Sequence, residues 1–151
     1  MFCSIIICND NDKLSFLVNC DINTISFSRT EVKMKIKKIA ELLNAEVLCG
    51  EEHLDGDVHS ACGCDMMSDV LAFVKDQAVL LTGLCNPQVV RTAEMMDMRC
   101  IVFVRGKMPP KDVVTLADES GIVVLATTER MYAACGILYK NGLSGGSVVN
   151  G

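Results

Sequence analysis

Tryptophan is absent from this sequence of 151 residues, and aromatic residues make up only 5% of it. Surfaces on which bases or sugar rings stack depend on aromatic side chains, so this scarcity argues against that kind of binding site. The sequence also lacks a cluster of Lys and Arg residues, and its formal net charge is -5. Because binding to phosphate backbones needs concentrated positive charge, we expect no nucleic-acid partner.

Long apolar runs are missing too. None approaches the roughly 18 residues that a membrane-spanning helix needs, so we expect no membrane partner. The first residues, Met1–Ser4, carry no positive side chain of the kind that opens a secretory signal peptide. The nine cysteines are odd in number and irregularly spaced, which is typical of free thiols rather than of a disulfide framework. These features favour a cytoplasmic protein with reduced cysteines.

Motifs that carry catalysis are equally scarce. The Gly-x-x-x-x-Gly-Lys-Ser/Thr loop that cradles nucleotide phosphates does not occur, which argues against kinase activity. No Ser-His-Asp or Cys-His arrangement can be assigned around the two histidines. We therefore predict no catalytic residue and no cofactor, and a protein that is not an enzyme.

Cys62 and Cys64, with His53 and His59 upstream, have side chains that can bind metal ions. Structural zinc sites are usually built from Cys-x-x-Cys pairs, and this sequence contains none. We therefore expect no metal, and we expect these two cysteines to lie at the end of a strand.

Three apolar runs dominate the second half of the chain. They are centred near Leu80, Val102 and Val124, 22 residues apart each time, and each is followed by a segment compatible with a helix. A strand, a helix of about three turns and two short loops fill that length, and such connections give parallel strands with right-handed crossovers. Residues 78–142 are therefore predicted to form a β-α-β-α-β-α unit.

The first repeat has clear boundaries. Ala78–Leu81 is an uninterrupted apolar run, as in a strand buried on both faces of a parallel sheet. Thr82 and Gly83 end this strand. Asn86 suits the N-cap of the next helix, and Pro87 suits its first position.

The second and third repeats follow the same plan. Their strands are expected at residues 100–104 and 122–125, and Gly121 and Gly142 are expected to end the helices that follow. Thr127 or Thr128 would cap the last helix.

A less regular entry precedes the repeats. Apolar residues between positions 36 and 43 recur at helical spacing, and Asn44 can end that helix in the left-handed conformation. Residues 46–49 and 58–61 are predicted strands, and residues 66–74 are a predicted helix. The predicted fold class is thus α/β, with a layered, mainly parallel sheet of three β-α repeats, preceded by a helix and a small β-rich entry.

Residues 1–33 do not continue this pattern. Ile5–Cys8 and Leu14–Val18 could form a hairpin, or the segment could be a leader or the product of a start site placed too early. We expect the folded domain to span residues 34–143. The Gly- and Ser-rich residues 144–151 are expected to form a flexible tail.

Several segments resemble a known family. Lys38–Glu52, Cys62–Leu71 and the Leu-Leu-Thr-Gly run that ends at Gly83 are similar to stand-alone DRTGG domains. Such domains occur chiefly as accessory modules of phosphotransacetylases, cobyric-acid-synthase-like proteins and CBS-domain pyrophosphatases, and their fold is similar to the N-terminal domain of HPr kinase. The resemblance implies a regulatory or assembly role and a homodimer, with a metabolic enzyme or a sensor kinase as the partner.

Loops that follow neighbouring parallel strands emerge at one edge of a sheet, where α/β proteins bind ligands. Residues 82–86, 105–109 and 126–128 should therefore converge. Helix N-termini in these loops offer N–H groups and partial positive charge, which suits an anion. By analogy with the family, that anion is a nucleotide or another small phosphate ligand. The candidate ligand-binding residues are Thr82, Gly83, Asn86, Arg105, Gly106, Lys107, Thr127 and Thr128.

Two classes of function remain open at this stage. The first is a non-catalytic, dimeric regulatory or assembly module; the alternative is an enzyme or metal-thiol protein that uses the strand-end loops or Cys62 and Cys64. The candidate residues can bind a ligand but include no obvious base, which favours the first class.

Overall fold

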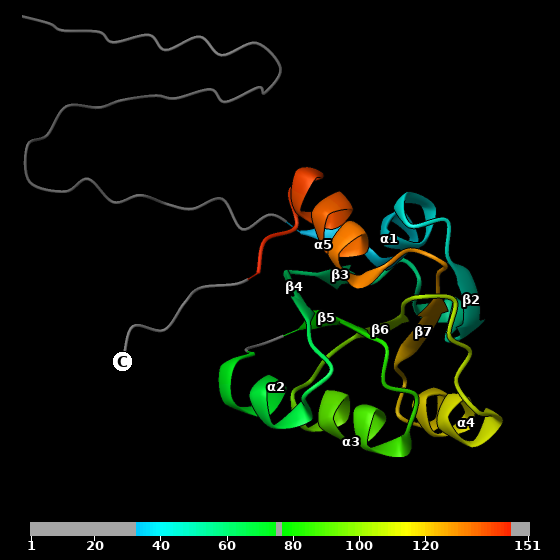
Figure 1. Ribbon diagram of the computed structural model, residues 1–151. Coiled ribbons are helices and arrows are strands. Elements are labelled where there is room, and N and C mark those ends of the chain that lie inside the picture. The colour runs from blue at the N-terminus through cyan, green and yellow to red at the C-terminus, as the bar shows by residue number, and fades with distance from the viewer. Residues whose placement is uncertain (1–32, 75–76, 146–151) are drawn as a thin grey trace, which may run out of the picture.

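Figure 1 shows the computed structural model of the chain, which describes residues 33–74 and 77–145. A five-stranded sheet lies at the centre, with strand order β2-β7-β6-β5-β4. The elements, in chain order, are β1 (Met34–Lys35), α1 (Ile36–Leu42), β2 (Glu46–Cys49), the short 3-10 helix η1 (Glu51–His53), β3 (Asp57–Val58), β4 (Ser60–Gly63), α2 (Met67–Phe73), β5 (Ala78–Thr82), α3 (Pro87–Met95), β6 (Cys100–Phe103), α4 (Lys111–Glu119), β7 (Val123–Ala126) and α5 (Met131–Lys140).

Helices cover both faces of the sheet. Figure 1 shows α2, α3 and α4 on one face and α1 and α5 on the other. Strands β5, β6 and β7 are parallel neighbours, and all of their residues are buried. This layered α/β architecture confirms the predicted fold class, and the 22-residue spacing corresponds to successive β-α units.

The β-rich entry completes the same sheet at its two edges. β4 pairs parallel with β5, whereas β2 pairs antiparallel with β7, so that Glu46 lies opposite Ala126. The strand predicted over residues 58–61 is divided in two at His59. Val58 belongs to β3, which pairs with β1 in a separate two-stranded sheet, and β4 begins at Ser60.

Alternate residues of the central strands face two separate cores. Val79 and Leu81 pack with residues of α1 and α5, and Leu80 packs with residues of α2, α3 and α4. This alternation follows from the two-residue period of a strand. Burying a side chain of this size stabilises the fold by about 1.5–3 kcal/mol, so the three repeated strands are its main hydrophobic support.

Most helix ends lie where the sequence predicted them. Asn44 follows α1 with φ 44°, and Gly121 and Gly142 follow α4 and α5 with φ 67° and 99°. One prediction was wrong: the N-cap of α5 is Arg130, not Thr127 or Thr128. The helix begins after both threonines. The Thr127 hydroxyl donates a hydrogen bond to the carbonyl of Leu43 instead of capping the helix.

The segments outside the described residues include most of two predicted regions. The leader predicted at residues 1–33 lies outside them up to residue 32, and the tail predicted at residues 144–151 lies outside them from residue 146. Met34, where we expected the domain to begin, is buried and pairs with Val58 in β3. Among residues 33–74 and 77–145, no helix has the length and apolar character needed to cross a membrane.

Candidate ligand-binding site

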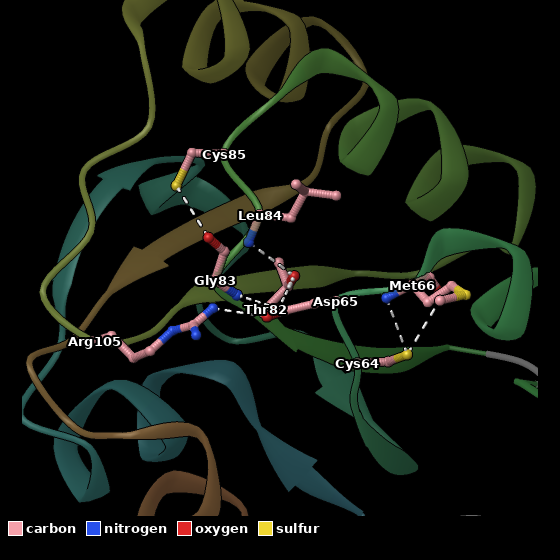
Figure 2. Close-up of polar contacts among 8 residues, drawn as sticks. All are labelled: Cys64, Asp65, Met66, Thr82, Gly83, Leu84, Cys85 and Arg105. Carbon is pink, nitrogen blue, oxygen red and sulfur yellow. Dashed lines mark hydrogen bonds and ion pairs between the residues drawn. The ribbon is translucent and has the colours of Figure 1, made fainter.

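The loops that follow β4, β5, β6 and β7 leave the sheet at one edge and are joined by hydrogen bonds, and Figure 2 shows those among the loops after β4, β5 and β6. Asp65 follows β4 and accepts hydrogen bonds from Thr82 and Gly83 at the end of β5. Arg105, after β6, donates to the same carboxylate. The backbone N–H of Arg105 donates to the carbonyl of Glu129, after β7. Four neighbouring strand ends are thus linked in the order in which the strands lie in the sheet.

The Asp65 carboxylate is the centre of this network. Its Oδ1 accepts hydrogen bonds from the Thr82 hydroxyl at 3.0 Å and the Gly83 N–H at 2.7 Å, and its Oδ2 accepts one from Arg105 at 2.7 Å. Partial burial alone would raise the pKa of this carboxyl group, but the hydrogen bonds from Gly83 and Thr82 and the charge of Arg105 outweigh burial and lower the pKa. Asp65 is therefore ionised at neutral pH and is a weak proton acceptor.

Arg105 is held through both its backbone and its side chain. Its φ is 68°, in the left-handed region that costs a non-glycine residue about 1–2 kcal/mol. Its guanidinium lies so close to Gly83 that a Cβ added at that position would overlap it. Glycine at position 83 is therefore needed for the contact seen in Figure 2. The Arg105 side chain remains 43% exposed, so a solvent-borne ligand can reach it.

Thr127 joins this edge of the sheet to the end of α1. Its hydroxyl donates to the carbonyl of Leu43 at 2.7 Å and accepts a hydrogen bond from the N–H of Glu129 at 3.2 Å. Its carbonyl accepts a hydrogen bond from the N–H of Gly106 at 2.9 Å. The Thr127 side chain is thus buried in structural contacts, whereas Thr128 beside it is exposed.

Asn86 occupies the N-cap position of α3, as predicted, but its side chain makes no capping hydrogen bond. Its Oδ1 is buried and has no hydrogen-bond partner among the residues that the structure describes. Leaving a buried acceptor unpaired costs about 1–3 kcal/mol. The loop between β5 and α3 therefore contains an acceptor that an N–H or O–H group of a ligand could satisfy.

A comparison with protein-family models matches residues 38–140 to the DRTGG domain. The chain belongs to the DRTGG domain family. A solved structure with the same fold contains the CBS and DRTGG domains of the regulatory region of Clostridium perfringens pyrophosphatase, complexed with the activator diadenosine tetraphosphate. The two chains are 17% identical with a TM-score of 0.59, and the match covers 69% of this chain and 45% of that one. This chain thus matches less than half the length of the solved one, and it matches no curated protein sequence.

The structure of this DRTGG domain brings the three candidate loops together. Thr82, Gly83 and Arg105 meet around Asp65, and Gly106 is bonded to the loop after β7 through its backbone. Lys107 and Thr128 are exposed on the same loops, and Asn86 lies at the start of α3. A ligand-binding role for these residues stays a prediction.

Asp65 is the residue of this edge that sequence reasoning missed. It follows β4 in the same way that Thr82 and Gly83 end β5, so the rule that strand ends converge would have included it. In the sequence, the nearby Cys62 and Cys64 are the residues with the chemistry of metal ligands, and Asp65 matches no motif. Recognising Asp65 required knowing that β4 lies beside β5 in the parallel sheet.

Two cysteines near this edge, Cys62 and Cys85, have raised pKa values. Burial, together with nearby Cys64 and Cys135, raises the pKa of Cys62 to about 11. Burial also raises the pKa of Cys85. Cys64 accepts a hydrogen bond from the N–H of Met66 at 3.3 Å. Because the thiolate is the reactive form, Cys62 and Cys85 are poor nucleophiles at neutral pH. Within the described parts of the chain, no group of three His, Cys, Asp or Glu residues is placed to hold a metal ion.

An open hollow of about 660 Å³ lies at the opposite edge of the sheet, where β5, β6 and β7 begin. Its lining includes Lys33 and Arg99 but also Glu52 and Asp57. Because these charges are of opposite sign, they offset one another. Asp65 offsets the charge of Arg105 in the same way at the other edge, so charge alone does not separate the hollow from that edge as a place for an anion.

Proposed function

We propose that this DRTGG domain is a non-catalytic regulatory or assembly module, that it acts as a homodimer, and that it binds a small phosphate-bearing ligand where the strand-end loops converge. The observation that supports this proposal is the network that links four strand ends through Asp65 and Arg105. Because each loop is bonded to the next, a ligand that replaces one contact shifts the others. A regulatory module needs such a coupled surface.

A phosphate group would bind the guanidinium of Arg105, because the planar N–H donors of arginine match phosphate oxygens. The ligand has to compete with Asp65, which accepts a hydrogen bond from one Nη of Arg105 at 2.7 Å. Lys107 on the same loop adds a second positive charge, whereas the start of α3 adds little, because Pro87 has no N–H and the N–H of Val89 donates to the carbonyl of Asn86. The unpaired Oδ1 of Asn86 is buried, so it would accept a hydrogen bond from a hydroxyl or amino group of the ligand only if the loop between β5 and α3 shifts on binding.

A nucleotide satisfies both requirements, since it combines phosphates with hydroxyl and amino donors. The regulatory region of the Clostridium perfringens pyrophosphatase was solved with diadenosine tetraphosphate, which makes dinucleoside polyphosphates an informative class to test. In this proposal the domain transmits ligand binding to a metabolic enzyme or a sensor kinase.

The alternative of an enzyme or metal-thiol protein has less support from the site. An acid-base catalyst needs a pKa near the working pH, whereas the pKa of Asp65 is lowered. A thiol nucleophile needs a lowered pKa, whereas burial raises the pKa values of Cys62 and Cys85. Both shifts favour binding over catalysis.

The experiment is a thermal-shift screen with ATP, diadenosine tetraphosphate and acetyl phosphate, followed by calorimetric titration of any compound that stabilises the protein. It compares the wild-type chain with an Arg105→Ala/Lys107→Ala variant and with Arg91→Ala, which removes an exposed arginine from the middle of α3. A ligand at 100 times its Kd stabilises the folded state by about 2.7 kcal/mol. We expect that stabilisation in the wild-type chain and in Arg91→Ala but not in the double variant.

Equal stabilisation of all three proteins would place the ligand outside this edge of the sheet. If no compound raises the melting temperature at millimolar concentration, the ligand-binding part of the proposal is wrong and an assembly role alone is left.

A further inference from the structure

Helix α5 differs from the other helices in the character of its outer surface. Lys140 is the one charged residue among its ten, whereas α4 carries four charged residues among nine. A helix that is apolar on all sides is normally buried. Yet Tyr132 is 92% exposed and Tyr139 is 72% exposed, on the face of the sheet opposite α2, α3 and α4 (Figure 1). Within residues 33–74 and 77–145, two large aromatic side chains are therefore left uncovered on this helix.

Gly136 lies between these tyrosines on the same side of α5, because residues four before and three after it share its helix face. A glycine inside a helix is about 1 kcal/mol less favourable than an alanine. No atom lies within 4 Å of a Cβ added at Gly136, so packing among the described residues does not require glycine there. Glycine does permit the close approach of another backbone from outside.

The same three residues have the symmetry of a two-fold contact. If two α5 helices cross antiparallel near Gly136, Tyr132 of one copy faces Tyr139 of the other, twice over. In a two-fold interface, each residue near the axis lies opposite the same residue of the other chain. A charged residue there would therefore face an identical charge and repel it. The centre of this face carries none, and Lys140 lies at its end.

The charges at the ends of the helix do not oppose this arrangement. With a rise of about 1.5 Å per residue, the two Lys140 side chains of an antiparallel pair would start about 13 Å apart, beyond the range of strong repulsion in physiological salt. Each would come close to the residues that precede the other α5, where Glu129 and Arg130 carry opposite charges that offset each other. The aromatic residues and the glycine therefore fit a second copy of this chain, and the charges do not oppose it.

We infer that α5 is the surface through which two copies of this chain associate, with the two helices packed antiparallel across a two-fold axis at Gly136. The inference rests on the homodimer proposed above and assigns its interface. Tyr132 and Tyr139 supply the buried aromatic area, and Gly136 lets the helix backbones approach each other.

Sedimentation equilibrium of the full chain tests this interface. The key variant is Gly136→Arg, which places a long charged side chain at the crossing point. Its matched control is Met95→Arg, which introduces the same residue at a 74% exposed position on α3, on the other face of the sheet. We expect the wild-type chain and Met95→Arg to sediment at about twice the chain mass of 16.4 kDa, and Gly136→Arg to sediment at 16.4 kDa.

A Tyr132→Ser/Tyr139→Ser variant provides a second test, because it alters only exposed side chains and should fold even if Gly136→Arg does not. We expect it to raise the dimer dissociation constant at least about tenfold. Far-UV circular dichroism verifies that each variant is folded.

The outcomes separate this inference from the proposal on which it rests. A wild-type chain that is monomeric would overturn both the homodimer and the interface. A dimer that persists in Gly136→Arg and in the tyrosine variant, or that Met95→Arg also dissociates, would overturn the α5 interface alone. Neither result depends on whether a phosphate ligand binds.

Discussion

The two edges of the central sheet are held together in different ways. Where β6 and β7 begin, Asp97 and Gly121 end the preceding helices with φ 49° and 67°, so the chain turns through local backbone geometry. At the other edge, Asp65 contacts Arg105, 40 residues further along, and Thr127 contacts Leu43, 84 residues earlier. The turns at the first edge depend on residues adjacent in sequence, whereas the side-chain contacts at the second edge exist only when the sheet is complete. Function is proposed at the second edge, where distant residues act together.

Among substitutions that test the contacts of the second edge, we expect the largest loss of stability from Thr127→Val. Valine has nearly the same shape but no hydroxyl, so the Leu43 carbonyl and the Glu129 N–H lose their partner. We expect the free energy of unfolding, measured in urea, to fall by about 1–3 kcal/mol.

Thr115→Val, at an exposed position of α4, is the matched control, and it should change stability by less than about 0.5 kcal/mol. If the free energy of unfolding falls equally in both variants, the Thr127 hydroxyl does not hold the loop after β7 to the end of α1.

A smaller effect is expected from Asp65→Asn, which keeps the shape of the side chain and removes its charge. Because the carboxylate is half exposed, we expect a loss of about 1 kcal/mol at pH 7. Folding lowers the pKa of Asp65 from its ordinary value of 3.8, so its charge stabilises the fold fully above that value. This stabilisation is lost as the pH falls through the lower folded-state pKa. The difference between wild type and variant, measured by urea unfolding from pH 7 to pH 3, should therefore shrink in acid.

The matched control lies at the other edge. Asp97→Asn makes the same change in a left-handed turn that asparagine also tolerates, and it should alter stability by less than about 0.5 kcal/mol. If the difference in free energy of unfolding between wild type and Asp65→Asn stays constant with pH, the carboxylate charge does not have the role assigned to it.

The smallest effect on stability is expected from Gly83→Ala. The new Cβ displaces the Arg105 guanidinium and breaks its pair with Asp65, which is worth less than about 1 kcal/mol because both side chains are partly exposed. In an Asp65→Asn background, Gly83→Ala should lower the free energy of unfolding by less, because the charged pair with Arg105 is already absent. Additive losses in the double-mutant cycle would show that the guanidinium contact contributes nothing.

The sequence predicted the fold well where the signal was local. Continuous apolar runs identified β5, β6 and β7, because a strand buried on both faces contains apolar residues at every position. Asn44 and Gly121 identified helix ends through their tolerance of positive φ. From these elements the rule of right-handed crossovers led to the edge at which the candidate loops converge.

Predictions that depended on pairing between distant segments were incomplete. The antiparallel position of β2 beside β7 follows from the completed sheet and not from residues 46–49 themselves. Thr127 matched the pattern of a helix cap, but its hydroxyl bonds to Leu43 because α1 lies next to that loop in the fold. Asn86 occupies the predicted N-cap position, but its side chain makes no capping hydrogen bond.

The sequence by itself determined the order of the repeated strands and helices, most helix ends and the burial of the repeated strands, because hydrophobic period and turn chemistry act over a few residues. Only the tertiary structure decided that Asp65 meets Thr82, Gly83 and Arg105, and that the other described residues leave Tyr132 and Tyr139 of α5 exposed. Both features arise from the lateral order of the strands and from which helices cover each face. A sheet acquires that order only when strands distant in sequence pair, so no local pattern records it.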